Sequence, residues 1–426
     1  SGVTGLLVED LVKKLENEYN VISWDDSFKQ FEILGDAVSR PQFLSFLRQR
    51  VNKTYDERGK TQLFVRRASE WGAGLLTDQV CDFAEQHRIT TTEWRFEHAI
   101  TNLDELPQCV TIAAQNWEMA YAVDAPRGNV IFCYVEPSRD LEKTRDAASK
   151  LLRDKSRQFG IKALPILIVL LIDNEGSLGQ HMAELAVLDE DLDEQDKVRF
   201  GNLVGAHRQK CLNLFLVKLE AMIKDRHYVT AFPAPLEAKR LNPVCSEIFQ
   251  RIYHRALCFP FDGFSTARGN AADSCMALTS ELLNGVLDYQ TVTGKPIKEK
   301  NRALEVLNNS WRVFTKKGDV TRRPTYDVAR AILQEWEDQL TREGDSLTLG
   351  EAIRRICKPP FGANLASAGL LLGVFIRARK DDFSVLVDGQ TTDFSRIVSD
   401  GLFRGKSLDL NKLEHICLVH ADREGG

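Results

Sequence analysis

Two apolar stretches, NVIFCYV at residues 129–135 and LIVLLI at residues 167–172, decide the fold class of this chain. Residues 140–159, between them, are highly charged and carry apolar side chains at helical spacing. Strands that are apolar throughout are typical of parallel sheets covered on both faces, and parallel neighbours need a crossover connection of about this length. The pattern therefore predicts a parallel βαβ unit.

Most of the remaining sequence has helical periodicity. We expect a long helix over residues 197–226 and three or four short helices over residues 63–122. Residues 21–26 and 28–33 instead indicate two short strands around an acidic turn. The acidic run at residues 189–196 indicates a solvated helix start. The predicted fold class is mainly α with a small α/β (parallel βαβ) domain.

The C-terminal part has a different pattern. A helix is predicted over residues 349–357 and another over residues 366–379, and strands at 383–387 and from 391 onward resemble a hairpin. Between the two helices, Pro359, Pro360 and Gly362 indicate a rigid structural turn, because proline restricts the preceding residue and glycine permits positive φ. Helix, turn, helix and hairpin in this order predict a terminal winged-helix-like module.

These patterns divide the chain into four predicted domains. They are a helical domain with a short β-hairpin (1–125), an α/β domain with a long helix (126–232), a helical domain (233–345) and the winged-helix-like module (346–426).

Composition favours a reduced, intracellular protein. The net charge of −5 argues against a globally basic nucleic-acid coat. The nine cysteines include no C-x-x-C pair, and the eight histidines form no H-x-x-x-H motif, so neither a disulfide framework nor a metal site is expected. The longest apolar run is too short for a bilayer, and we expect a cytoplasmic protein with no membrane partner. Because Ser1–Gly2 replaces an initiator methionine, we also expect a segment of a longer polypeptide.

No catalytic motif is complete, so whether the chain is an enzyme stays open. Gly59–Lys60–Thr61 matches the end of a phosphate-binding loop, but Thr54 occupies the position of the first glycine and no strand precedes it. Glu136 and Asp173 follow the two apolar strands, where an α/β sheet places ligand sites. An ordinary turn is the favoured interpretation of these acids, and an Mg²⁺ site is the alternative. We assign no catalytic or metal-binding residue and no cofactor.

Six cations of the terminal module are the candidate nucleic-acid contacts. Placed on adjacent helices, they could line a phosphate backbone. Acidic residues nearly balance the basic ones over residues 300–426, which favours solvated faces and protein contacts over DNA. The six cations are Arg354, Arg355, Lys358, Arg377, Arg379 and Lys380.

The turn at residues 358–362, KPPFG, and the apolar helix at 368–375 resemble the PPYG/PYGW turn and helix of very large P-loop ATPases from prokaryotic anti-phage systems. Examples are the BREX ATPase and relatives from phosphorothioation-linked defence. Residues 93–96 and the βαβ segment are similar to an insert of these proteins. The resemblance implies a non-catalytic C-terminal region that binds DNA or other subunits of a defence complex. ATP hydrolysis is not carried over, because the Walker A motif and the acidic pair are absent. The alternatives are an Mg²⁺-dependent enzyme and a pure protein scaffold.

Overall fold

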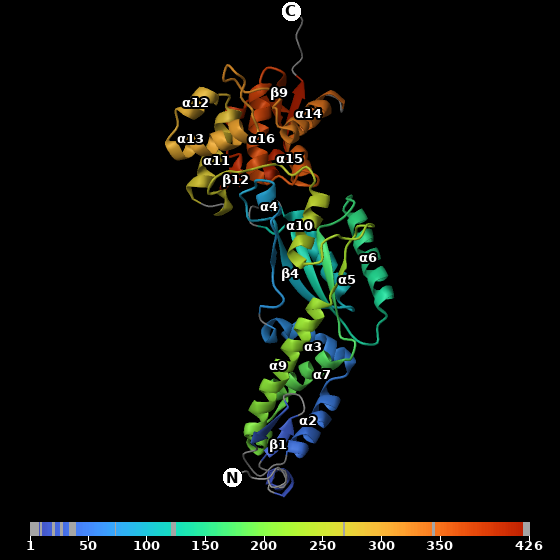
Figure 1. Cartoon of the computed structure of the whole chain (residues 1–426). Coiled ribbons are helices and arrows are strands. Elements are labelled where there is room, and N and C mark those ends of the chain that lie inside the picture. Colours follow the sequence, from blue (N-terminus) through green and yellow to red (C-terminus); the bar gives the residue numbers. More distant parts are fainter. Residues whose placement is uncertain are drawn as a thin grey trace, which may run out of the picture.

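The computed structural model of the chain describes residues 8, 11–18, 22–25, 29–33, 40–72, 74–120, 125–266, 269–342 and 346–420. The outline is elongated (Figure 1), with helices near the N-terminus, a β-sheet in the middle and a rounded C-terminal part at the other end. We call these parts the stalk (residues 40–72 and 177–224), the sheet layer (79–172 and 227–252) and the globule (254–420).

Five strands form the sheet layer, in the order β3-β4-β5-β6-β7. Their bounds are β3 Gln79–Val80, β4 Arg95–Asn102, β5 Gly128–Val135, β6 Ile166–Ile172 and β7 His227–Val229. Strands β4, β5 and β6 are parallel, and β3 and β7 run antiparallel to their neighbours at the two edges. Helix α6 (Leu141–Gln158) connects β5 to β6, so the predicted parallel βαβ unit is confirmed.

The prediction of helices alone over residues 63–122 is wrong at β4, which is a third parallel strand. Its sequence, RFEHAITN, contains Arg95, Glu97 and His98, and several of its side chains are partly exposed. Its outer neighbour β3 has only two residues, so much of β4 is covered on one side only. Such a strand has no continuous apolar run, and the alternation of polar residues alone does not distinguish it from a helix.

Helices cover both faces of the sheet layer. The crossover helices α5 (Leu106–Met119) and α6 contact each other and lie on one face, as two right-handed connections between neighbouring strands require. On the other face, α3 (Glu57–Trp71) contacts β4 and β5, and α10 (Leu241–Ile252) contacts β3. Strand β5 is therefore buried along its whole length. The short helix α4 (Phe83–Gln86) precedes β4.

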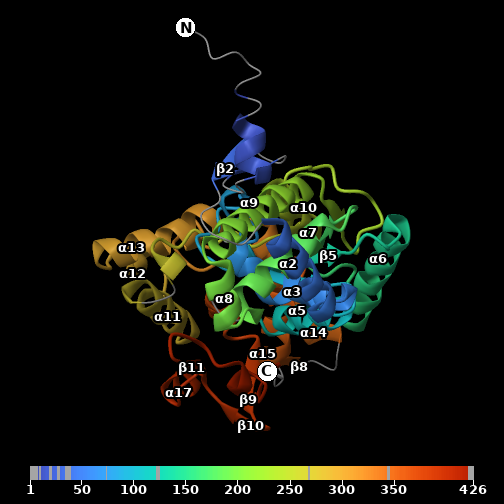
Figure 2. The same cartoon turned by 90° about the horizontal axis from the view of Figure 1, so that it is seen from below.

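The stalk is a helical bundle in which α7 contacts α2, α3 and α9. Figure 2, seen from below, shows these helices gathered near the centre of the outline. The long helix predicted over residues 197–226 is broken in two at Gly201, whose φ of 44° is one that glycine adopts readily. The stalk helices are α2 Arg40–Thr54, α3 Glu57–Trp71, α7 Ser177–Ala186, α8 Glu194–Phe200 and α9 Asn202–Lys224.

The acidic run at residues 189–196 is only partly the solvated helix start that the sequence predicts. Asp193 caps α8 and accepts a hydrogen bond from the Asp196 amide at 2.7 Å. Earlier in the run, the π-helical segment η2 (Val187–Asp191) continues α7 into the bundle. There the Asp189 carboxylate lies 2.5 Å from Arg208 Nε. These acids therefore bind stalk helices together.

Near the N-terminus, the predicted pair of short strands is confirmed. Strands β1 (Ile22–Asp25) and β2 (Gln30–Ile33) are antiparallel. The preceding π-helical segment η1 covers Lys14–Glu18. Residues 3–19 have apolar side chains at helical spacing, and of these the structure describes residues 8 and 11–18, of which 8 and 11–13 are α-helical.

The globule is mainly helical. Its helices are α11 Asn270–Leu283, α12 Tyr289–Thr293, α13 Ile297–Ala303, α14 Asp327–Arg342, α15 Leu349–Cys357, α16 Leu365–Ala378, α17 Phe394–Ser399 and α18 Leu410–Leu413, with the short segments η3 Phe264–Thr266 and η4 Leu304–Ser310. Its strands are β8 Ser346–Thr348, β9 Phe383–Val387, β10 Gln390–Thr392, β11 Phe403–Arg404, β12 Ser407–Leu408 and β13 Ile416–His420. Among the described residues, no helix is both long and apolar enough to span a membrane.

The elements predicted for a winged helix follow one another in the expected order, but their packing differs from that module. Helix α16 packs against α11 so closely that a Cβ on Gly373 would lie 2.6 Å from Leu282 Cβ. Residues 365–376 are buried, whereas a winged helix inserts an exposed recognition helix into DNA. Strand β13 also lies between β8 and β9. These contacts define a helical globule with a small antiparallel sheet, and they do not define a winged-helix module.

Candidate functional site

The predicted turn at Pro359, Pro360 and Gly362 joins α15 to α16 and forms the junction between the globule and the sheet layer. The amides of Gly362 and Phe361 donate to the Lys358 carbonyl oxygen, at 3.1 and 3.2 Å. The Pro360 carbonyl accepts from the Arg255 amide at 3.2 Å. The turn is therefore tied both to its own helix and to the segment that follows α10.

Arg127 completes this junction from the sheet side, immediately before β5. Its guanidinium donates to the carbonyl oxygens of Ala363 at 2.9 Å and of Cys357 at 3.3 Å, which lie on either side of the turn. The same group lies over the ring of Trp94, 4.6 Å from the centroid, and 3.6 Å from the carboxylate of Glu93. Arg127 is 3% exposed and Glu93 is 2% exposed, so this ion pair is fully enclosed.

Glu93 also reaches the globule directly. Its Oε1 accepts a hydrogen bond from Asn364 Nδ2 at 3.1 Å, and Asn364 caps helix α16 through the Ser367 amide at 2.9 Å. The buried carboxylate therefore contacts the N-terminus of the central globule helix, where the helix dipole favours negative charge.

The six candidate DNA-binding cations do not form a free basic face. Arg354 pairs with Glu414, Arg355 lies 3.4 Å from Glu335, and Lys358 lies 2.6 Å from Glu118 of α5. Arg377 Nε donates to the Leu287 carbonyl at 3.1 Å. Lys380 is exposed.

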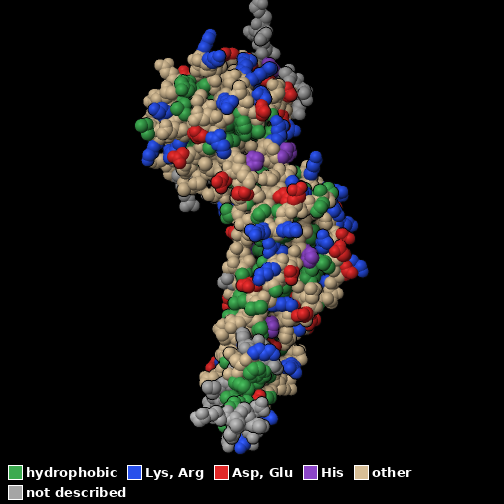
Figure 3. Space-filling view, viewed as in Figure 1, with side chains coloured by type: hydrophobic (Ala, Val, Ile, Leu, Met, Phe, Trp, Pro, Cys, Tyr) green, Lys and Arg blue, Asp and Glu red, His purple; other side chains and the backbone are tan. Residues whose placement is uncertain are grey.

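Arg379 is the most enclosed of the six, at 2% exposed. Its Nη2 donates to the Arg322 carbonyl at 3.0 Å and lies 3.1 Å from Glu337. On the face shown in Figure 3, the other Lys and Arg side chains of the globule are interspersed with Asp and Glu. This surface therefore lacks the concentrated positive potential that attracts a phosphate backbone.

Glu136 and Asp173 follow adjacent parallel strands, as predicted, and both make contacts within the chain. Glu136 lies 2.5 Å from Arg139. Asp173 is fully buried, and its Oδ2 accepts from the Tyr134 hydroxyl at 3.0 Å and from the Gly179 amide at 2.9 Å. Burial and the Asp173 charge raise the pKa of Tyr134, so its hydroxyl stays protonated and donates.

The ring of Phe64, from α3, stacks on Tyr134 with centroids 5.1 Å apart. Helices α3 and α7 therefore pack against the ends of β5 and β6, at the edge of the sheet at which α/β proteins commonly bind ligands. The Asp173 side chain fastens β6 to the start of α7, which is a structural role.

Two weaker motif matches are not placed as their chemistry requires. Gly59–Lys60–Thr61 lies inside helix α3, and the Gly59 amide donates to the Asp56 side chain, so it is not part of a phosphate cradle. Glu237–Ala238–Lys239 has the E-x-K spacing of metal-dependent nucleases, but it lies in the loop before α10 and not on a strand.

Sequence reasoning missed one group of ligand-type side chains. His181 and Glu184, on α7, face Cys211, on α9, and their donor atoms all lie within 4.8 Å of one another. All nine cysteines are free thiols, and no other group of three or more such side chains is found among the described residues. The available signal was the spacing H-x-x-E in one helix and H-x-x-x-C in the next, because each spacing places two side chains on one helix face.

No family model, no curated protein and no solved structure matches this chain. The assignment of function therefore depends on the geometry described above.

Gly362 is expected to tolerate no side chain. Its φ is 57°, and an added Cβ would lie 2.6 Å from Trp94 Cη2 and 2.8 Å from Tyr253 Cδ1, both in rigid rings. Gly362→Ala should cost about 1–2 kcal/mol for the backbone conformation and about 1–3 kcal/mol more for overpacking. The control is Gly389→Ala, because Gly389 has a φ of 81° and open space around it. This variant should lose stability only through the cost of the backbone conformation. Equal losses in urea denaturation would contradict the close fit of the turn.

Removing Arg127 should be among the most destabilising single changes at the junction. Arg127→Ala leaves the Glu93 carboxylate buried without its counter-charge, which costs roughly 3–5 kcal/mol. The double variant Arg127→Ala/Glu93→Gln should lose less than the sum of the two single losses, because no buried charge remains. Arg145→Ala removes the exposed pair with Glu142 and should cost under about 1 kcal/mol. Additive losses in denaturant titrations would refute the coupling.

Asp173 should matter for stability and not for metal binding. Asp173→Ala leaves the Tyr134 hydroxyl and the Gly179 amide without an acceptor, which we expect to lower the free energy of unfolding by about 1–3 kcal/mol. Millimolar Mg²⁺ should leave the melting temperature of the unaltered chain unchanged. A saturable rise that disappears in Asp173→Asn would instead favour the Mg²⁺-dependent enzyme.

Proposed function

We propose that this chain is a non-catalytic scaffold region of a large defence-type ATPase. In this proposal it holds the parts at its two ends in a fixed relation and acts through protein contacts. The observation that supports the proposal is the enclosed junction around Arg127, Glu93 and the 358–362 turn. A junction of this kind would couple the globule rigidly to the sheet layer.

The sheet layer supports the same interpretation at its opposite edge. The amino ends of its parallel strands face the globule, and their carboxyl ends face the stalk through Asp173 and Tyr134. Both edges are therefore used for packing between parts. An enzyme with this sheet would keep its carboxyl edge open to a substrate.

Protein contacts are favoured over DNA because most of the six candidate cations already contact acceptors within the chain. Breaking the contacts of Arg379 would expose a buried group, and Arg377 and Lys358 already have acceptors inside the chain. Exposed pairs such as Arg355–Glu335 are weak, but acidic partners beside them oppose a phosphate backbone.

The resemblance to anti-phage ATPases supports the larger context of the proposal. Two segments show the resemblance. The KPPFG turn forms part of the junction, and the apolar helix α16 lies at the centre of the globule. In this context nucleotide hydrolysis belongs to another part of the polypeptide. The present segment transmits or fixes the relative position of the parts at its two ends.

Distances between spin labels test the rigidity that a scaffold of this kind needs. Labels introduced as genetically encoded side chains at Val198, in the stalk, and Ile297, in the globule, occupy exposed positions. We expect one narrow distance distribution. The control pair, Val286 and Ile297, lies within the globule and sets the width of a rigid reference. A broad or bimodal distribution for the first pair alone would rule out a rigid scaffold.

A salt titration of duplex binding distinguishes the DNA alternative. Phosphate contacts would give a log–log slope on the order of one unit per contact, and the scaffold proposal expects no measurable slope at micromolar protein. The matched variant is Lys380→Ala, which removes an exposed cation of the predicted set. Salt-dependent binding that this variant weakens would favour DNA.

A further inference from the structure

Helices α7 and α9 present four ligand-type side chains to each other. His181 and Glu184 are three residues apart on α7, and His207 and Cys211 are four residues apart on α9, so each pair lies on one face of its helix. The two helices pack side by side in the stalk. Bundle cores commonly build metal sites from such spacings on facing helices.

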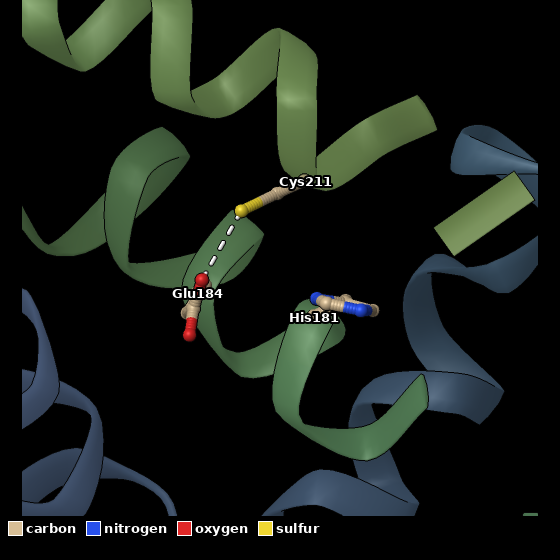
Figure 4. A group of neighbouring side chains, drawn as sticks. All are labelled: His181, Glu184 and Cys211. Carbon is tan, nitrogen blue, oxygen red and sulfur yellow. Dashed lines mark hydrogen bonds between the residues drawn. The ribbon is translucent and has the colours of Figure 1, made fainter. Parts of the chain in front are cut away.

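The donor atoms already lie close together. Those of His181, Glu184 and Cys211 are all within 4.8 Å of one another, and Cys211 Sγ is 3.1 Å from Glu184 Oε2. In Figure 4 the three side chains converge from the two helices, and the end of the His181 ring that faces the other two carries a nitrogen. His207 Nε2 lies 3.1 Å from the same Oε2, and Gln180 Nε2 lies 2.8 Å from Oε1, so the carboxylate is held in orientation.

His181 carries the second, independent observation. Its Nδ1 is buried and has no hydrogen-bond partner among the described residues. Buried polar atoms in proteins are nearly always paired, so an unpaired nitrogen on an imidazole ring that lies beside a carboxylate and a thiol calls for a partner. The lone pair of a neutral imidazole binds borderline-soft metal ions well.

In the metal-free chain, burial and neighbouring groups shift the pKa values of all three side chains. Burial lowers the pKa of His181, which keeps its ring neutral at pH 7. Although burial opposes it, hydrogen bonds from His207, Gln180 and Cys211 lower the pKa of Glu184 to about 2, so the carboxylate is ionised. Burial, together with the Glu184 charge, raises the pKa of Cys211, so without a cation the thiol keeps its proton.

We propose that His181, Glu184 and Cys211 bind one Zn²⁺ ion, which clips α7 to α9 in the stalk, and that His207 holds the Glu184 carboxylate in place. The mixed nitrogen, oxygen and sulfur donor set fits Zn²⁺ better than Mg²⁺ or Ca²⁺, which prefer oxygen alone. On binding, the Cys211 S–H bond breaks, a sulfur–zinc bond forms and the proton goes to solvent. One thiolate and one carboxylate then neutralise the two charges of the ion.

The ion has a path into the site. The side chains of Glu184 and His207 are 19% and 13% exposed, so the cluster opens partly to water. A clip at this position would stabilise the packing of α7 against α9 in the stalk. It is independent of the scaffold function and would be present even if that function were wrong.

The test uses the full chain after treatment with a chelator. Titration with Zn²⁺ by calorimetry should give one ion per chain, and Co²⁺ should give a thiolate-to-cobalt charge-transfer band in the near ultraviolet. Cys211→Ala should abolish the band and lower the Zn²⁺ affinity by about 100-fold or more, since changes in the residues around the ligands alone cost 10–100-fold. Cys109→Ala, which alters a partly exposed cysteine on α5, should leave the cobalt band and the Zn²⁺ affinity unchanged.

A second variant separates ligand loss from misfolding. His181→Gln removes a ring with no hydrogen bond at Nδ1, so the metal-free chain should keep its melting temperature. Zn²⁺ should raise the melting temperature of the unaltered chain and fail to raise that of His181→Gln. The proposal is overturned if no ion binds at micromolar Zn²⁺, or if Cys211→Ala and His181→Gln bind it as well as the unaltered chain does.

Discussion

The guanidinium of Arg127 lies between the sheet layer and the globule. Its contacts set the orientation of the globule relative to the sheet layer. It donates to carbonyls on both sides of the 358–362 turn while it stacks on Trp94 and pairs with Glu93. A planar, always charged group satisfies several acceptors at once only in one geometry. The charges of Arg127 and Glu93 are enclosed. A different arrangement of the sheet layer and the globule would therefore leave one of these two charges buried and unpaired.

The same packing involves both edges of the parallel strands. The amino edge of the parallel strands packs on the globule, and the carboxyl edge packs on the stalk through Tyr134 and Asp173. A sheet used in this way connects the globule to the stalk. Ligand-type side chains with close donor atoms lie instead between α7 and α9, in the stalk. In the proposed function the sheet layer has a mechanical role, and the proposed zinc site lies between α7 and α9.

The candidate site was only partly predictable from the sequence. The turn residues Pro359, Pro360 and Gly362 were identified, because proline and glycine restrict the backbone locally and this needs no tertiary information. The basic residues were identified by type, but their partners were not, since Glu118 and Glu337 are far from them along the chain. The His181 group stayed hidden for the same reason, because neither helix carries enough donors by itself.

The sequence by itself determined the features that depend on local patterns. Strands β5 and β6 are apolar throughout because both faces are covered, and helix α6 shows its charged face at helical spacing. The tertiary structure alone decided the features in which one segment depends on a distant one. Strand β4 is a strand because β5 pairs with it, helix α16 is enclosed because α11 and β12 pack on it, and Arg127 is buried because the globule covers it. Periodicity reports which face of an element is apolar, and only long-range packing selects what covers that face.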